Sequence, residues 1–166
     1  MQLARFVFLS MLPSAGPQSD SDAGVVWMLV SPNNRALGRG YGVHDSYAGC
    51  RAAVLALRDG GPRCRPLVSN VDRTGQWTWR ILLDDRPVAV SSRSYLRTRE
   101  CGYNLERFLE AVPTAELVAG TRTVRRGRWH GGQVEDGAGG PSGRGLGAAA
   151  RPGDPTGTGP SRTVLR

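Results

Sequence analysis

The stretch that decides the fold is Trp77-Thr78-Trp79-Arg80-Ile81-Leu82, in which large apolar residues alternate with polar ones. This period of two is typical of a strand with one buried face. The turn-forming residues Asp84-Asp85-Arg86-Pro87 follow, and then comes a second strand-like segment, Val88-Ala89-Val90-Ser91. The pattern predicts a β-hairpin with its turn at residues 84–87.

The same pattern occurs earlier in the chain, which indicates an internal repeat. Trp27 precedes Trp79 by 52 residues, and the first hairpin is expected from strands over residues 25–30 and 35–38. Its turn would be Ser31-Pro32-Asn33-Asn34, because Asn tolerates the positive φ of a tight turn. At an offset of 51, further pairs follow: Cys50 with Cys101, Val54 with Leu105, and Leu57 with Phe108.

A segment with a period near 3.6 follows each hairpin and predicts one helix per repeat. Asp45 or Ser46 is expected to cap the first helix, which should end at Gly60-Gly61-Pro62, and Thr98 is expected to cap the second, which should end before Pro113. The predicted core combines both helical stripes with the hairpin faces: Trp27, Cys50, Val54, Leu57, Trp79, Ile81, Cys101, Leu105 and Phe108. Arg58 and Arg107 lie one position off the stripes, so we expect them on the surface.

One more strand is expected ahead of each hairpin, over residues 5–9 and 66–71. The N-terminal run also has features of a short secretory leader, and this alternative stays open here. The sequence therefore predicts an α+β fold of two β-β-β-α repeats, residues 4–62 and 63–120, that form an antiparallel sheet with one helix per repeat packed on it. Such a chain is expected to be a monomer with internal pseudo-symmetry.

Residues 121–166 are expected to form a basic tail that is disordered beyond about Arg126. From Gly120 onward the chain is rich in Gly, Pro and Arg and poor in large apolar residues, so it buries too little surface to offset the entropy of ordering. A loop is expected over residues 13–24, which have the same polar composition.

The second repeat resembles the YegP-like domains, small bacterial domains of unknown function that occur singly or in tandem. Gly75-Gln76-Trp77-Thr78-Trp79-Arg80 is similar to the opening G-x-W-x-W-R strand of that family, and Ser91, Ser92, Tyr95, Cys101 and Leu105 match positions that follow it. The resemblance covers residues 66–112 well and residues 5–60 more loosely. It implies that the two units share a sheet and exchange the strand after each helix, namely residues 66–71 and 116–124. It implies no activity and no ligand.

No catalytic or metal-binding pattern emerges from the residues themselves. The three cysteines, Cys50, Cys64 and Cys101, show no C-x-x-C spacing, and His44 and His130 are the only histidines. Cys50 and Cys101 are expected in the core and Cys64 in a loop. The Gly38–Gly42 segment lacks a phosphate-binding pattern, and Asp84-Asp85 is ordinary turn chemistry. We therefore expect a non-enzymatic protein with no cofactor and no metal.

The remaining chemical feature is basicity, although composition weakens its meaning. The chain carries a net charge of +8, its 22 basic residues are all Arg, and Ile81 is the only Ile, as in proteins from GC-rich genomes. The candidate contacts for nucleic acid or another anionic partner are Arg93, Arg97, Arg99, Arg122, Arg125, Arg126, Arg128 and Trp129. The preferred interpretation is a small binding or assembly module, and a nucleic-acid accessory protein is the alternative. With an odd cysteine count and no apolar run of membrane-spanning length, we expect a cytoplasmic protein that does not enter membranes.

Overall fold

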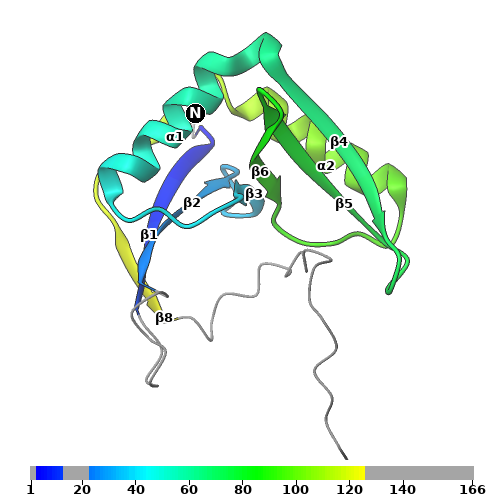
Figure 1. Cartoon of the computed structure of the whole chain (residues 1–166), viewed down its shortest axis with the longest axis horizontal. Coiled ribbons are helices and arrows are strands. Elements are labelled where there is room, and N and C mark those ends of the chain that lie inside the picture. Colours follow the sequence, from blue (N-terminus) through cyan, green and yellow to red (C-terminus); the bar gives the residue numbers. More distant parts are fainter. Residues whose placement is uncertain (1–2, 13–22, 126–166) are drawn as a thin grey trace, which may run out of the picture. The chain divides into compact units, whose positions relative to one another are not determined.

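Two helices lie on one face of a mixed eight-stranded β-sheet in the computed structural model of the chain (Figure 1). The structure describes residues 3–12 and 23–125, which all lie in one compact unit. The elements are β1 (Arg5–Leu12), β2 (Gly24–Val30), β3 (Ala36–Gly40), α1 (Tyr47–Gly60), the short 3₁₀ helix η2 (Gly61–Arg63), β4 (Cys64–Val71), β5 (Gln76–Leu83), β6 (Arg86–Ser91), α2 (Thr98–Ala111), β7 (Glu116–Leu117) and β8 (Arg122–Arg125). The chain thus has the predicted α+β class.

The strand order is β4-β5-β6-β3-β2-β1-β7, and β8 also pairs with β1. All pairs between β4 and β1 are antiparallel, as predicted, whereas β7 and β8 run parallel to β1. The expectation of a wholly antiparallel sheet was therefore wrong at this edge. The chain enters this edge after α2, through a crossover connection rather than a hairpin. β7 and β8 therefore run in the same direction as β1.

The segment that follows each helix crosses to the other half of the sheet. The strand after α1, β4, pairs along its whole length with β5, and the strands after α2, β7 and β8, pair with β1 (Figure 1). β8 overlaps the start of the expected tail, and most of it falls within residues 116–124, the segment that the resemblance implies as a strand. Pairing with β1 satisfies backbone hydrogen-bonding groups of this polar segment, whose side chains bury little surface. Residues 126–166 and the predicted loop over residues 13–22 lie outside the described residues.

The core lies between the sheet and the two helices. All nine residues expected there are buried, each with no more than 8% of its surface exposed. Phe108 of α2 reaches the centre, where its ring lies 4.6 Å from that of Trp79 and 6.5 Å from that of Trp27. Phe6 of β1 packs edge-on against Trp27. One aromatic cluster therefore connects both halves of the sheet.

Two turns and the helix starts explain where the elements begin and end. Asn34 has a φ of 59°, and Asp84 and Asp85 have φ values of 49° and 63°, so both hairpins turn through left-handed residues. The second turn is only these two residues; Arg86 and Pro87, expected in it, belong to β6. Ser46 caps α1 by accepting from the Gly49 N–H at 3.1 Å. For α2 the N-cap is Arg97 rather than Thr98, and it makes no side-chain cap.

Among the residues that the structure describes, neither helix has the length and apolar content needed to cross a membrane.

Candidate binding face

The helices cover one face of the sheet, and the other face carries a row of side chains from six strands. Cross-strand pairs place them in the order Val7, Met28, Arg39, Val90, Arg80 and Leu67, one from each strand from β1 to β4. Directly paired residues point to the same face of a sheet. Their sequence neighbours Trp27, Trp79 and Ala89 point into the core, so this row, which we call the central row, lies on the helix-free face.

Arg39 stands near the middle of the central row, between Met28 and Val90. Gly38 and Gly40, on either side of it, point toward the core, where a Cβ atom on Gly38 would lie 2.5 Å from Trp79 and one on Gly40 would lie 2.8 Å from Trp27. The indole rings of Trp79 and Trp27 leave no room for side chains at the two glycine positions. Because side chains alternate along a strand, Arg39 points to the helix-free face. Desolvation by burial lowers the pKa of Arg39 below its ordinary value.

Arg80 lies on the other side of Val90, and both arginines pair directly with that residue. The guanidinium carbon of Arg80 lies 5.7 Å from the centre of the Tyr41 ring, within the range of a cation–π interaction. Val90 is only 1% exposed. The centre of the face is therefore an apolar residue between two guanidinium groups, with an aromatic ring beside one of them.

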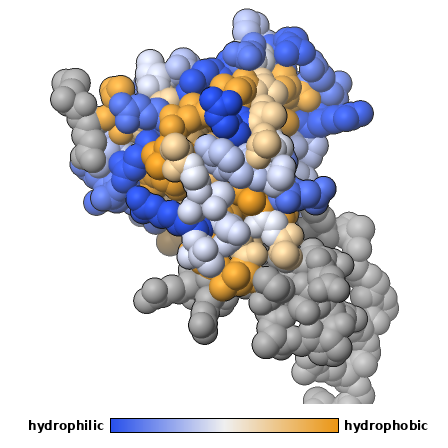
Figure 2. All heavy atoms as spheres, turned by 90° about the vertical axis from the view of Figure 1, so that its left-hand side faces the viewer, coloured by the Kyte–Doolittle hydropathy of each residue, from blue (hydrophilic) through white to orange (hydrophobic). Residues whose placement is uncertain are grey.

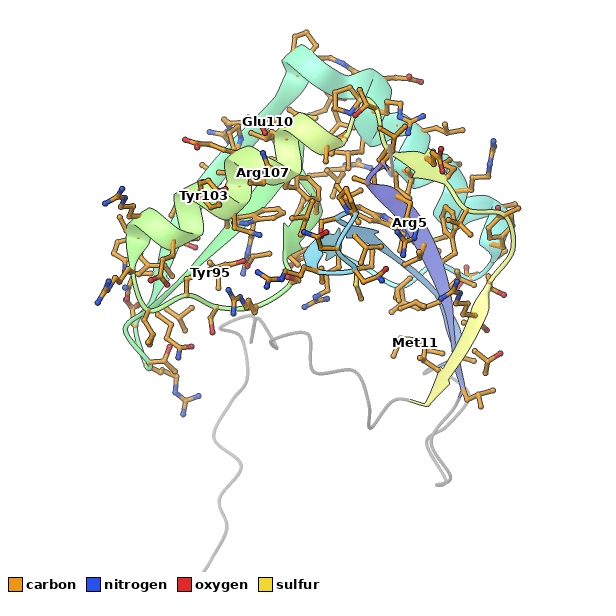
Figure 3. All side chains as sticks on the ribbon, turned by 180° about the vertical axis from the view of Figure 1, so that it is seen from behind. Arg5, Met11, Tyr95, Tyr103, Arg107 and Glu110 are labelled. Atoms are coloured by element: carbon orange, nitrogen blue, oxygen red, sulfur yellow. The ribbon has the colours of Figure 1, made fainter. Side chains whose placement is uncertain are left out.

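A third arginine, Arg5, marks the β1 side of the same face (Figure 3). It donates from Nη2 to the side-chain oxygen of Asn34 in the first hairpin turn, and its buried Nη1 has no hydrogen-bond partner among the described residues. At the far end of the sheet, Arg65 makes the corresponding contact with Asp85 of the second turn, at 3.0 Å. Each arginine thus joins the first strand of a hairpin unit to its turn.

The sequence-predicted arginines lie on several different elements. Arg93 is exposed and lies over the ring of Tyr95 at 4.9 Å, while Arg97 is the N-cap of α2 and Arg99 lies in its first turn. Arg122 and Arg125 belong to β8, at the opposite edge of the sheet from β4. Arg126, Arg128 and Trp129 lie outside the described residues. Sequence reasoning missed Arg39 and Arg80, and the alternation of β5 was the one signal that placed Arg80 opposite the tryptophans.

The cysteines and the acidic turn have structural surroundings. Burial raises the pKa of Cys50 to about 12 and that of Cys101 to about 11, which keeps both thiols protonated. Cys64 is the first residue of β4 rather than a loop residue, and its Sγ lies 3.8 Å from the carbonyl oxygen of Leu57. Asp84 and Asp85 pair with Arg63 and Arg65 on the surface, at 2.6 and 3.0 Å. No group of metal-binding side chains occurs within residues 3–12 and 23–125.

Comparison with known proteins supports the fold. No family model matches the sequence. No curated protein matches it either. The structure is similar to the solution structure of YegP from E. coli, a protein of unknown function, with 10% sequence identity, a TM-score of 0.53 and coverage of 76% of this chain and 97% of that chain. A UPF0339 protein from Shewanella oneidensis is similar at 10% identity and a TM-score of 0.52, over 75% of this chain and 93% of that chain. The chain therefore has a YegP-like fold.

Proposed function

We propose that the protein is a non-enzymatic binding module and that the helix-free face of its sheet holds an acidic peptide segment of a partner protein. The observation that carries this proposal is the placement of Arg39 and Arg80 on either side of Val90 in the central row. An extended peptide with alternating acidic and apolar residues presents its carboxylates on one side. Two arginines on strands separated by β6 match such a ligand by charge, and Met28 supplies apolar contact beside Arg39.

The arrangement favours a peptide over nucleic acid. Phosphate backbones are held by many exposed cations along a groove. Arg93, Arg97 and Arg99 do not form such a track, because one covers Tyr95 and the other two lie at the start of α2. The protonated, buried thiols of Cys50 and Cys101 are poor nucleophiles, which supports a role without catalysis.

The test is binding of a fluorescein-labelled 12-residue peptide of alternating Glu and Leu, measured by fluorescence anisotropy. Arg39→Met and Arg80→Met, which keep side-chain length and remove charge, should each weaken binding at least tenfold. Arg107→Met is the matched control, because Arg107 is an exposed arginine of α2, paired with Glu110 on the other side of the molecule (Figure 3). Equal affinities for all three variants, or tighter binding of a single-stranded oligonucleotide than of the peptide, would refute the proposal.

The proposal includes a tandem origin of the binding face, with two β-β-β-α copies related by a two-fold axis at the Arg39–Val90 pair. This is supported by features that match at the repeat offset. The backbone bridge between Val25 and His44 corresponds to that between Trp77 and Tyr95, and the register shift at Leu29/Val30 corresponds to the one at Ile81/Leu82. On this view Met28 and Arg80 are equivalent positions, and only the second copy has acquired the charge.

We also propose that the protein is monomeric and cytoplasmic. All three cysteines are free, which fits a reducing compartment. The internal two-fold relation places in one chain the two halves that would otherwise need a dimer. Equilibrium sedimentation and fractionation of cells with an antibody to the native chain test these two statements.

A further inference from the structure

One arginine ties each hairpin turn to the strand that precedes the hairpin. Arg5 of β1 donates to the side-chain oxygen of Asn34, and Arg65 of β4 donates to Asp85 at 3.0 Å. Asn34 and Asp85 both have a left-handed backbone, with φ values of 59° and 63°. The two contacts therefore join matching elements but differ in charge, because the second turn supplies a carboxylate and the first supplies a neutral amide.

We call Arg5 with Asn34 the first corner, and Arg65 with Asp85 the second corner. The arginine and the aspartate of the second corner form an ion pair, so their charges cancel. The turn of the first corner, residues 31–34, reads Ser-Pro-Asn-Asn and contains no acid. The first corner thus retains the positive charge of its guanidinium group.

An acidic residue does lie beside Arg5 in the sheet. Glu116 of β7 is its direct partner in the parallel pairing with β1. The Glu116 side chain is exposed, and no ion pair forms between the two within the part of the chain that the structure describes. A carboxylate that stays in water at such a distance contributes little. Glu116 therefore does not take the place that Asp85 has in the second corner.

The guanidinium group of Arg5 also has an unused donor. Its Nη2 atom binds Asn34, whereas its Nη1 atom is buried and has no hydrogen-bond partner among the described residues. A buried donor without an acceptor costs free energy, more so when its group is charged. Guanidinium groups form their strongest hydrogen bonds with carboxylates and phosphates. A carboxylate at the first corner would both satisfy this donor and neutralise the charge.

The first corner belongs to the face that carries the proposed peptide site. Arg5 lies two residues before Val7 of the central row, so the two side chains share one face. Arg80, Arg39 and Arg5 occupy every second strand, β5, β3 and β1. Neighbouring arginines of this series are separated by about 10 Å across the strands. Figure 2, which views the molecule from the β1 side, shows hydrophilic residues interspersed among hydrophobic ones.

We infer that the first corner binds a side-chain carboxylate of the acidic peptide, as a third charged contact beside Arg39 and Arg80. The identity of the occupant rests on the proposed function. The Nη1 atom of Arg5 donates to the carboxylate, and Asn34 holds Nη2 and thereby orients the guanidinium group. The neutral turn residue is what leaves the corner open to a ligand, because an aspartate there would neutralise Arg5 internally, as Asp85 neutralises Arg65.

This reasoning gives the first experiment, which uses the full chain and the Glu-Leu peptide with an amidated C-terminus. Asn34→Asp places the carboxylate of the second corner in the first and should weaken peptide binding by about fivefold or more, because it competes for Arg5. Asn33→Asp is the matched control, since it adds the same charge to the neighbouring exposed turn residue. Its effect should stay below about twofold, because solvent and salt screen an exposed charge.

Acetate tests the corner without the peptide. Two-dimensional NMR of the arginine Nε–H signals follows a titration with sodium acetate, with sodium chloride used to hold the ionic strength constant. The Arg5 signal should shift in the natural chain and in Asn33→Asp, and the shift should be largely lost in Asn34→Asp. Asp85→Asn gives the second corner the neutral residue of the first, so its Arg65 signal should gain a response that the natural chain lacks.

Two outcomes would overturn the inference. One is equal loss of peptide affinity in Asn34→Asp and Asn33→Asp, which would assign the effect to long-range charge. The other is an Arg5 signal that does not respond to acetate in the natural chain. A natural chain that fails to bind the peptide while its Arg5 signal responds to acetate would contradict the proposed function and still support a carboxylate site at this corner. The two proposals can therefore fail separately.

Discussion

Arg58, near the end of α1, donates from Nε to the carbonyl oxygen of Val112 at 3.3 Å, directly beyond the end of α2. A second donation, from Nη2, goes to the carbonyl oxygen of Ala115, and the guanidinium carbon lies 5.9 Å from the centre of the Phe6 ring. One side chain thus ties the first helix to the end of the second and to β1. The expectation that Arg58 lies free on the surface was wrong.

Arg58→Ala should therefore destabilise the protein by about 1.5–3 kcal/mol, the usual range for hydrogen bonds to a charged group. Arg107→Ala is the control, because Arg107 is exposed and pairs only with Glu110 on its own helix, at 3.2 Å. Its cost should stay within about 0.5 kcal/mol. Urea unfolding followed by circular dichroism measures both, and equal costs would contradict the role given to Arg58.

The two helices should carry comparable shares of the core. Leu57 is 3% exposed and Phe108 is fully buried. Truncation leaves a cavity in addition to the lost transfer free energy, so Leu57→Ala should cost about 2–5 kcal/mol and Phe108→Ala about 3–5 kcal/mol. Thermal melts of residues 3–125 with each substitution give the comparison. A neutral Leu57→Ala together with an unfolded Phe108→Ala would show that the two repeats are not structural equals.

Gly38 should not tolerate a side chain. Its Cβ would come within 2.7 Å of the Phe108 ring as well as meeting Trp79, so Gly38→Ala should cost at least about 1–3 kcal/mol through overpacking. Gly102 provides the matched control, because it lies in α2 with open space around it. There the same substitution should stabilise the protein by about 0.5–1 kcal/mol, since Ala is the better helix former. Calorimetric melting temperatures should shift in opposite directions.

Stability should fall as the pH rises above 9. Burial raises the pKa of Cys50 to about 12 and that of Cys101 to about 11 in the folded protein, from an ordinary value of 9.0. The stabilising difference is fully present below pH 9 and is lost at higher pH, because the unfolded chain then releases protons that the folded chain retains. Each thiol should contribute a loss of about 1 kcal/mol between pH 9 and pH 10. The double variant Cys50→Ala and Cys101→Ala should show a shallower decline in urea titrations at these pH values; an identical decline would show that other groups cause it.

The elements that follow local periodicity were predictable, and the contacts that depend on three-dimensional register were not. Alternation in residues 77–82 and the stripe of Cys50, Val54 and Leu57 located a hairpin and a helix, because burial on one face imposes those periods. Arg58 escaped prediction because its acceptors come from a segment more than fifty residues later. Arg39 and Arg80 escaped for a related reason: only the pairing of β3, β6 and β5 places them around Val90. The predicted length of the second turn was wrong because Pro87 is compatible both with a turn and with the beginning of a strand.

The parallel pairing of β1 with β8 also constrains how the chain can be made. Leu9 finds its partner in Arg122, more than a hundred residues later. At a typical synthesis rate of about 5–20 residues per second, the ribosome needs roughly 6–23 seconds to produce that stretch. During this interval the outer edge of β1 is exposed, even after its hairpin partner β2 has emerged. Among the described strands, β1 is synthesised first and β8 last, so closure of this edge is a late event in the folding of the nascent chain.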